Sequence, residues 1–346
     1  GQAGLFFTML SLGSLFGTFF GALASDYLNR KYLFLTCTII LLAGLAGVGF
    51  VPGYTGMLVI IFLFSLFGSP IGAIGQSIML HMYPEKREKY VSLQTTFAAL
   101  GSFLAPLLIT LNFAIGLNWR WPFIQTAGIA LLLALAVFSS RIPAAAERKT
   151  HLPLKTIFAN SQVRICAILI FLSISLDIGF SYWLAEYFAS ELHVSLGLSS
   201  AVVGIYLAGI ITGRLLVPLY LRRMKGYQAI QRSLILAAAA MVLFLTIPNS
   251  GVKAVLCYFY GLGIAPLFPL MMARGASAYP DQPGAVTGFL FGAMSLGGMV
   301  FPLLLGFLAE RFGIERSYYF IGVFLVGVFL IITFWVGGRQ RKSRTN

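Results

Sequence analysis

The sequence predicts an all-α membrane protein with eleven transmembrane helices arranged in two parallel, repeated bundles. Of its 346 residues, 59% are hydrophobic and 10% are charged, and the mean hydropathy is +0.90, whereas soluble domains are about 25% charged. Residues 1–25, 32–84 and 90–119 contain no Asp, Glu, Lys or Arg. Since a bilayer core about 30 Å thick needs about 20 apolar residues per helix, these uncharged runs are predicted to cross a membrane.

Charge clusters and turn signals divide the apolar runs into individual spans. The run 32–84 divides at Pro52-Gly53-Tyr54-Thr55-Gly56, because the interior of a helix does not carry such a turn signal. The eleven predicted spans are residues 2–25, 32–51, 57–81, 90–115, 121–140, 165–189, 197–221, 230–248, 254–273, 285–309 and 317–337.

Basic residues alternate between the loops and predict the orientation of the chain. The loops after odd-numbered spans, together with the tail, carry 19 of the 24 Lys and Arg residues, and the other loops carry four. Cytosolic loops are enriched in Lys and Arg, so the first set and the C-terminus are predicted to be cytosolic. The net charge of +14 therefore orients a multi-pass protein in the plasma membrane and does not indicate a nucleic-acid partner.

The two halves of the chain repeat each other. Residues 100–108 and 296–304 share five identities in nine positions at an offset of 196. Closer to the N-terminus, an offset of 192 pairs Gly21 with Gly213. Parallel repeats of membrane helices place a site at the midplane and operate by rocking of one repeat against the other.

The repeat predicts four regions: an N-terminal bundle over 1–140, a cytosolic linker over 141–164, a C-terminal bundle over 165–337 and a basic cytosolic tail over 338–346. The counterpart of the span 165–189 would precede Gly1. We therefore expect that the natural protein has a twelfth helix before Gly1, and that this chain lacks it.

A cytosolic loop resembles a signature of the major facilitator superfamily. Residues 22–31 are similar to its G-x-L-x-D-x-x-G-R-K motif, with matches at Asp26, Arg30 and Lys31. The resemblance implies a major facilitator fold in which these three residues help to hold a cytosolic gate shut; the alternative is a solvated loop whose charges only set topology. Arg214, inside a predicted span, is interpreted as a further gate residue, although its long side chain can also reach the membrane boundary.

Other motifs resemble the fucose permease-like branch of sugar–proton symporters within that superfamily. Asp177, Trp183 and Tyr187 follow its E-x5-W-x3-Y pattern with Asp in place of Glu, and residues 261–269 and 287–302 resemble two later helices. The sequence departs from the branch at Gln76, where Asn is usual. The resemblance implies transport of a sugar together with protons.

Asp177 is the candidate proton-coupling residue, because it lies near the middle of a predicted span. A carboxylate at the bilayer centre costs about 2.5–3.5 kcal/mol or more, so it must face a cavity or a partner. Trp183 and Tyr187 are candidate solute contacts, since an aromatic face stacks on a sugar; the alternative is an interfacial aromatic belt.

Buried amides provide further candidate solute contacts. Gln76, Gln94 and Asn112 lie within the spans of the first half. Amides in hydrocarbon either line an aqueous cavity or link neighbouring helices, and the sequence leaves both interpretations open for each residue.

The predicted function is therefore secondary active transport of a small polar solute by a monomer that uses protons. The resemblance implies that this solute is a sugar. No phosphate-binding loop, metal-ligand pattern or nucleophile motif is present, so we predict no enzyme activity, cofactor, metal or catalytic residue. Two alternatives remain: a drug–proton antiporter of the same superfamily, and a non-transporting membrane receptor or membrane-embedded enzyme.

Overall fold

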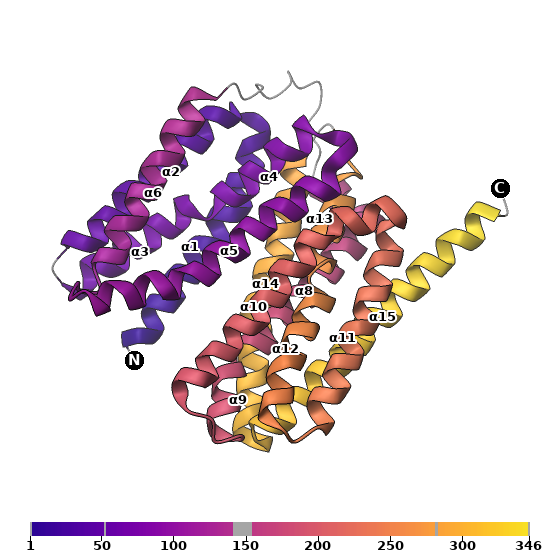
Figure 1. Ribbon diagram of the computed structural model, residues 1–346. Helices are drawn as coiled ribbons and strands as arrows, with labels where there is room; N and C mark the ends of the chain where they lie inside the picture. The colour runs from indigo at the N-terminus through magenta and orange to yellow at the C-terminus, as the bar shows by residue number, and fades with distance from the viewer. Residues whose placement is uncertain (1, 52, 141–153, 281–282, 345–346) are drawn as a thin grey trace. The chain divides into compact units, whose positions relative to one another are not determined.

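The protein is helical along almost its whole described length. The computed structural model describes residues 2–51, 53–140, 154–280 and 283–344, and these form helices joined by short connections (Figure 1). The predicted linker falls partly outside these ranges, since residues 141–153 are not described. The helices are α1 (Gln2–Tyr27), α2 (Arg30–Phe50), α3 (Tyr54–Gly68), α4 (Pro70–Met82), a 3₁₀ turn η1 (Pro84–Lys86), α5 (Arg87–Ala114), α6 (Trp121–Ser139), α7 (Leu154–Ala159), α8 (Ser161–Tyr182), α9 (Leu184–Ser190), α10 (Leu196–Arg223), α11 (Gly226–Thr246), α12 (Ser250–Ile264), α13 (Leu267–Ala276), α14 (Pro283–Phe312) and α15 (Ile314–Arg344).

The helices match the predicted transmembrane spans. Within the described residues, nine helical segments are long and apolar enough to cross a membrane, and each coincides with one predicted span. The two remaining predicted spans correspond to helices α1 and α5. The prediction of an all-α, multi-pass membrane protein is therefore confirmed.

Three of these spans consist of two helices with a break between them. Pro70 begins α4 directly after α3, and Pro266 lies between α12 and α13; proline lacks the N–H that would continue the ladder of the preceding helix. The third break lies at Trp183, between α8 and α9, where the backbone has φ −96° and ψ 0°. No proline marks this break, and the sequence did not predict it.

The helix boundaries determine the residue offset between the two copies of the repeat more precisely than the sequence matches do. Helices α2 and α11 are 196 residues apart at both ends, as are α3 and α12, and α1 and α10 end 196 residues apart. The offset of 192 expected near the N-terminus is therefore wrong. Four residues are about one helical turn, so the incorrect alignment kept similar residues on the same helical face.

The two copies also share their closest helix contacts. A Cβ at Gly13 of α1 would lie 2.6 Å from Phe62 O of α3, and a Cβ at Gly209 of α10 would clash with Tyr258 O of α12. The second pair repeats the first at an offset of 196, which relates Gly13 to Gly209 and Phe62 to Tyr258. Glycine is needed at these positions because the backbones approach too closely for any side chain, as in other membrane helix pairs.

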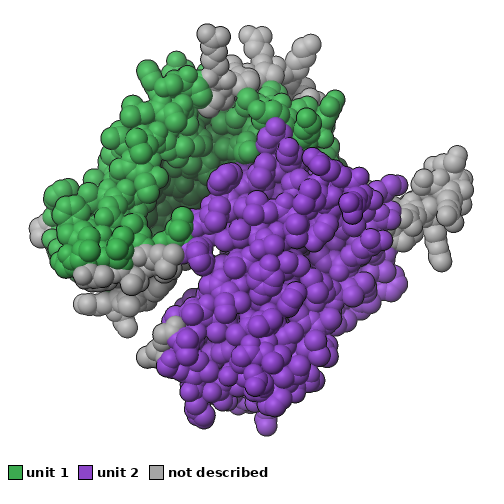
Figure 2. Space-filling view, in the orientation of Figure 1, with its two compact units in different colours: residues 1–87, 104–164, 275–292 green, residues 88–103, 165–274, 293–346 purple. Residues whose placement is uncertain are grey.

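By their contacts, the residues divide into two compact units (Figure 2). The first comprises residues 1–87, 104–164 and 275–292, and the second comprises 88–103, 165–274 and 293–346. Helices α5 and α14 thus contribute residues to both units. The second unit contains the interior polar cluster described next.

Candidate functional site

The centre of the candidate site is Asp177, in the middle of the span formed by α8 and α9. Tyr206 of α10 donates a hydrogen bond from its hydroxyl to Asp177 Oδ1 at 2.5 Å. Arg214 of α10 forms an ion pair, with its Nη2 atom 3.7 Å from Asp177 Oδ2. The side chains of Arg214 and Asp177 are 11% and 22% exposed. The carboxyl group therefore has two partners, one on each of its oxygen atoms; we call these three residues the Asp177 site.

The geometry of α10 explains how two residues on one helix reach the same carboxyl group. Tyr206 and Arg214 are eight residues apart, about 12 Å along the helix axis. Side chains on a helix tilt toward its N-terminus, so the long Arg214 side chain points back toward Tyr206. Asp177 lies between them, on the neighbouring helix α8.

Arg214 also contacts a third helix, α5. Its Nη1 atom donates to the backbone carbonyl of Thr95 at 2.9 Å, and Ser92 Oγ donates to the backbone carbonyl of Arg214 at 2.6 Å. Ser92 is fully buried and Thr95 is nearly so. These bonds lie within the second compact unit. Arg214 was predicted as a gate residue, and the structure places its guanidinium group beside Asp177.

An aromatic cluster closes one side of the Asp177 site. The ring of Tyr206 lies 5.3 Å from the ring of Phe180 and 6.3 Å from that of Tyr260. Tyr260 and Tyr318 donate hydrogen bonds to the α8 backbone carbonyls of Leu176 and Phe180, at 3.4 and 3.0 Å. All four rings are buried. The cluster holds the backbone of α8 on both sides of Asp177 and places low-dielectric material on one side of the site.

The predicted solute contacts Trp183 and Tyr187 occupy different surroundings. Tyr187 is 1% exposed, and its hydroxyl accepts a hydrogen bond from Lys253 Nζ at 2.6 Å. Trp183 lies at the break between α8 and α9, and its Nε1 atom has no hydrogen-bond partner among the described residues. Tyr187 thus belongs to the packed interior of the second unit, whereas Trp183 retains a free donor.

The predicted amide contacts also differ from one another. Asn112 and Gln125 exchange two hydrogen bonds, at 2.8 and 2.9 Å, and so link α5 to α6. Gln76 of α4 is 1% exposed, and its Nε2 atom lacks a partner among the described residues. Gln94 lies on α5, adjacent to Thr95. A buried amide donor without a partner costs about 1–3 kcal/mol, so Gln76 is the amide best suited to meet a solute or water.

The predicted gate residues Arg30 and Lys31 bind backbone carbonyls. Arg30 is 2% exposed and donates from Nε to Ser25 O at 3.2 Å. Lys31 Nζ donates to Phe138 O and Ser140 O, both at 2.7 Å. Lys31 therefore joins the start of α2 to the end of α6, where a cation is favourable at a helix C-terminus. The side chain of Asp26 lies outside the described residues.

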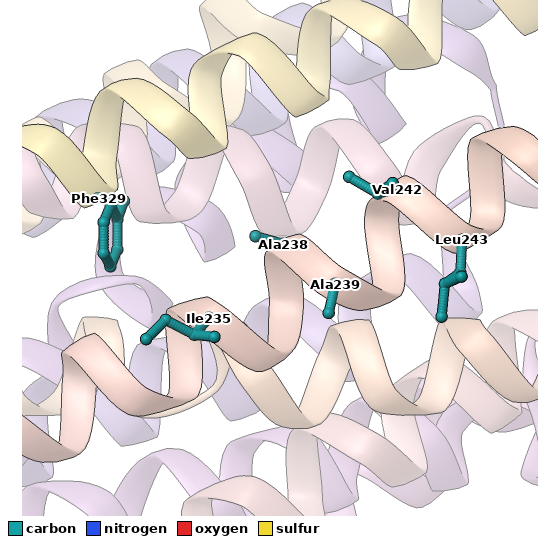
Figure 3. A pocket seen from close by; sticks show the side chains of 6 residues that line it. All are labelled: Ile235, Ala238, Ala239, Val242, Leu243 and Phe329. Atoms are coloured by element: carbon teal, nitrogen blue, oxygen red, sulfur yellow. The ribbon is translucent and has the colours of Figure 1, made fainter.

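An apolar groove on the second unit is unsuited to a polar solute. It has a volume of about 520 Å³ and lies between α11 and α15 (Figure 3). Its lining contains no polar side chain and is formed by Ile235, Ala238, Ala239, Val242, Leu243 and Phe329. Within the described residues, no group of three or more His, Cys, Asp or Glu is placed to hold a metal ion.

Comparison with known proteins identifies the family. The sequence model of the Major Facilitator Superfamily matches residues 1–291. The chain belongs to this superfamily. It is 22% identical over 327 residues to the "Uncharacterized MFS-type transporter YfkL" of Bacillus subtilis, covering 92% of this chain and 83% of that protein. It is 23% identical over 348 residues to the "Inner membrane transport protein YdiM" of Escherichia coli, covering 96% and 84%.

Solved structures confirm the major facilitator fold. The E. coli fucose:proton symporter FucP superposes with a TM-score of 0.81 at 14% identity, covering 96% of this chain and 90% of FucP. The proton:xylose symporter XylE superposes with a TM-score of 0.80 at 15% identity, covering 97% and 86%. At these identities the likeness shows the fold alone. It confirms the predicted major facilitator fold.

Sequence reasoning did not identify Tyr206, Ser92 or Lys253 as partners of the candidate residues. Tyr206 carries a partial signal, because it shares a span with Arg214 and its hydroxyl needs a partner when buried. Ser92 carries no such signal, since a serine in a membrane helix commonly bonds to its own backbone.

Proposed function

We propose that this major facilitator protein is a secondary active transporter that moves a small polar solute of the sugar class together with protons. The observation that carries the proposal is the Asp177 site: a carboxyl group near mid-span, with Tyr206 on one oxygen and Arg214 on the other. An acid in a membrane helix is costly and usually serves an ion pathway or a proton relay. FucP and XylE, which share the fold, are proton symporters of fucose and xylose by name.

In this proposal Asp177 takes up and releases the coupled proton. Its Oδ1 atom is occupied by the Tyr206 hydroxyl, and its Oδ2 atom faces Arg214. The solute contacts proposed to be most direct are Gln76, Gln94 and Trp183. Asn112 and Tyr187, which we also predicted as solute contacts, are proposed to act through packing, because Gln125 and Lys253 already occupy their polar atoms.

The proposal includes the remaining predictions from the sequence. The protein acts as a monomer in the plasma membrane, with its C-terminus in the cytosol and with bundles over residues 1–140 and 165–337. Asp26, Arg30 and Lys31 contribute to a cytosolic gate. The protein is not an enzyme.

Transport in proteoliposomes tests the proposal. Purified full-length protein is reconstituted, and uptake of radiolabelled L-fucose and D-xylose is measured with and without an imposed acid gradient. A gradient of one pH unit is worth about 1.4 kcal/mol per proton, so with one proton per solute molecule it supports accumulation of at most about tenfold. We expect gradient-dependent accumulation that a protonophore abolishes.

The variant Asp177→Asn separates coupling from solute binding. It should abolish gradient-driven accumulation while preserving exchange of labelled for unlabelled solute at equal concentrations. The matched control is Ser181→Ala, one turn further along α8, which removes a hydroxyl that bonds to Asp177 O at 2.8 Å and leaves the carboxyl group intact. Gradient-driven efflux of ethidium in place of sugar uptake would favour the drug antiporter, and an absence of any flux would favour a receptor or a membrane-embedded enzyme.

A further inference from the structure

The apolar groove between α11 and α15 lies on the surface of the second unit that faces lipid. Both helices belong to this unit. Two residues of the lining, Ile235 and Val242, are 56% and 59% exposed, and the groove has a volume of about 520 Å³ (Figure 3). Exposed apolar side chains in a membrane-spanning helix face the hydrocarbon of the bilayer. The groove is therefore continuous with the surface that contacts lipid.

Small side chains form the hollow of the groove. Ala238 and Ala239 are the smallest residues of its lining, and the larger Ile235 lies one turn before them on α11 (Figure 3). One turn before Ile235, Gln231 Nε2 donates a hydrogen bond to Thr333 Oγ1 of α15 at 3.4 Å, which joins the two helices at this end of the groove. A hollow without atoms forfeits the dispersion contacts of its lining. We therefore expect part of a neighbouring molecule to fill it.

A basic side chain lies at the same end of the groove. Arg232 is exposed and lies three residues before Ile235 and seven before Ala239, so all three share one face of α11. It lies at the cytosolic end of the predicted span 230–248. Because helical side chains tilt toward the helix N-terminus, Arg232 extends from the groove toward the cytosolic boundary. Lys225, also exposed, lies two turns before Arg232 on the same face. The groove therefore has an apolar body and a basic end.

The dimensions of the groove fit a single acyl chain. It extends along α11 from Ile235 to Leu243, which is about 12 Å of helix, and one leaflet of hydrocarbon is about 15 Å thick. A helix about 10 Å wide would displace about 900 Å³ over this length, more than the groove holds. An extended peptide would leave backbone N–H and C=O groups without partners in hydrocarbon. An acyl chain is thin enough and has no such groups.

We propose that the second unit binds one anionic phospholipid, with an acyl chain in the groove between α11 and α15 and its phosphate group at Arg232. In the predicted orientation, this lipid belongs to the cytosolic leaflet. Basic pockets between membrane helices on the cytoplasmic side bind anionic lipid head groups, and the planar guanidinium group of arginine suits phosphate. The lipid site is separate from the Asp177 site and does not depend on the proposed transport function.

The first copy of the repeat lacks both features of this site. At an offset of 196 residues, Arg232 corresponds to Thr36 and Ala238 corresponds to Leu42 of α2. Thr36 carries no charge, and Leu42 has a larger side chain than Ala238. The combination of a cation with a hollow is therefore specific to α11 and is not a requirement of the shared fold.

Native mass spectrometry of the purified, delipidated protein tests the proposal. It measures the binding of phosphatidylglycerol and of phosphatidylcholine with the same acyl chains. Arg232→Gln should weaken the binding of phosphatidylglycerol about fivefold, the equivalent of about 1 kcal/mol for one basic residue, and should leave that of phosphatidylcholine unchanged. Ala239→Phe fills the groove and should weaken the binding of both lipids.

Two matched control variants should leave the binding of both lipids unchanged. Lys155→Gln removes an exposed cation of α7, and Leu132→Phe enlarges a side chain of α6 that is 67% exposed. An effect of Arg232→Gln no larger than that of Lys155→Gln, or of Ala239→Phe no larger than that of Leu132→Phe, would overturn the proposal. A dimer in size-exclusion chromatography with light scattering that Ala239→Phe converts to a monomer would also overturn it, because a second copy of the chain would then occupy the groove.

A second measurement uses the unaltered protein and so does not depend on the folding of any variant. Phosphatidylglycerol with six-carbon chains should bind at least tenfold more weakly than the form with long chains, because each buried methylene contributes about fourfold to binding. Equal binding of the two forms would show that no chain occupies the groove. Binding of sn-glycerol 3-phosphate as tight as that of phosphatidylglycerol would identify a site for free phosphate groups and would likewise overturn the proposal.

Discussion

The two copies of the repeat share their backbone packing and differ in their polar interiors. In the first copy, Ser65 of α3 donates a hydrogen bond to Leu10 O of α1 at 2.6 Å. In the second copy, Gly261 of α12 corresponds to Ser65, and a Cβ added at Gly261 would lie 2.5 Å from Tyr206 O of α10. The same carbonyl position is therefore contacted in both copies. The residues around it differ: the second copy carries Tyr206 and Arg214 where the first has Leu10 and Thr18.

This difference separates what the fold requires from what the function requires. Close backbone approach at small residues holds α1 to α3 and α10 to α12 in the same way, because it depends on shape alone. Charge in a membrane interior is costly and needs a specific reason. The charged residues on one copy therefore indicate where the proposed proton chemistry lies.

The largest expected effect comes from removing the charge that distinguishes the copies. Arg214→Met should destabilise the protein by about 3–5 kcal/mol, because Asp177 loses its cation, whereas Thr18→Val at the corresponding position should cost about 1 kcal/mol. Thermal unfolding in detergent measures both. Adding Asp177→Asn to Arg214→Met should recover most of the loss, and a double variant no more stable than Arg214→Met would show that charge imbalance is not the cause.

The glycine contacts should respond equally in the two copies. Gly13→Leu and Gly209→Leu each place a side chain against a backbone carbonyl of the neighbouring helix, and each should cost about 3 kcal/mol through overpacking. The control is Gly128→Leu, since a Cβ at Gly128 meets no atom within 4 Å. The yield of folded protein in size-exclusion chromatography and the unfolding temperature provide the comparison. Sensitivity in one copy alone would argue against a shared packing rule.

Most of the fold follows from the sequence, because hydropathy and charge determine which segments enter a bilayer. For this reason the sequence predicted the membrane spans and the duplication. The offset of 192 failed because a shift of one helical turn preserves the facing residues, and the sequence does not reveal where a helix ends. The break at Trp183 was not predicted because no proline or glycine lies next to it in the sequence.

The candidate site could be predicted only in part from the sequence. Asp177 stood out because a carboxylate in an apolar span is costly. Its partners did not, since Tyr206 and Arg214 become neighbours of Asp177 only when α8 packs against α10. Tyr187 was expected at a solute site or a membrane interface, and its bond to Lys253 could not be foreseen, because the two residues are 66 positions apart.

A smaller effect should follow from replacing Lys253, which bonds to Tyr187 of α9, by the residue at the corresponding position of the first copy. Lys253 corresponds to Met57 at an offset of 196. Its ammonium group bonds to the Tyr187 hydroxyl and lies 5.1 and 4.9 Å from the ring centroids of Tyr187 and Phe244. Lys253→Met should therefore cost about 1–2 kcal/mol and speed hydrogen exchange in α9. Tyr187→Phe keeps the ring and should have a weaker effect; unchanged exchange in α9 for Lys253→Met would show that the lysine does not anchor that helix.

The smallest effect concerns the first residue of α2 and of α11. The first copy has Arg30 there, and the second has Gly226, where a Cβ would lie 3.0 Å from Glu88 Oε1 of α5. Burial raises the pKa of Glu88 above its ordinary value of 4.5, and the nearby Arg274 partly opposes this rise.

The pKa of Glu88 is higher in the folded protein than in the unfolded chain. The stabilisation that comes from protonated Glu88 is therefore fully present below pH 4.5 and is lost as the pH rises through the raised pKa. Glu88→Gln fixes a neutral side chain at this position. It should raise the unfolding temperature at neutral pH by no more than about 2 °C and should flatten its rise on acidification. Glu85→Gln is the matched control, since Glu85 is exposed. A lower unfolding temperature for Glu88→Gln at neutral pH would show that attraction to Arg274 outweighs burial.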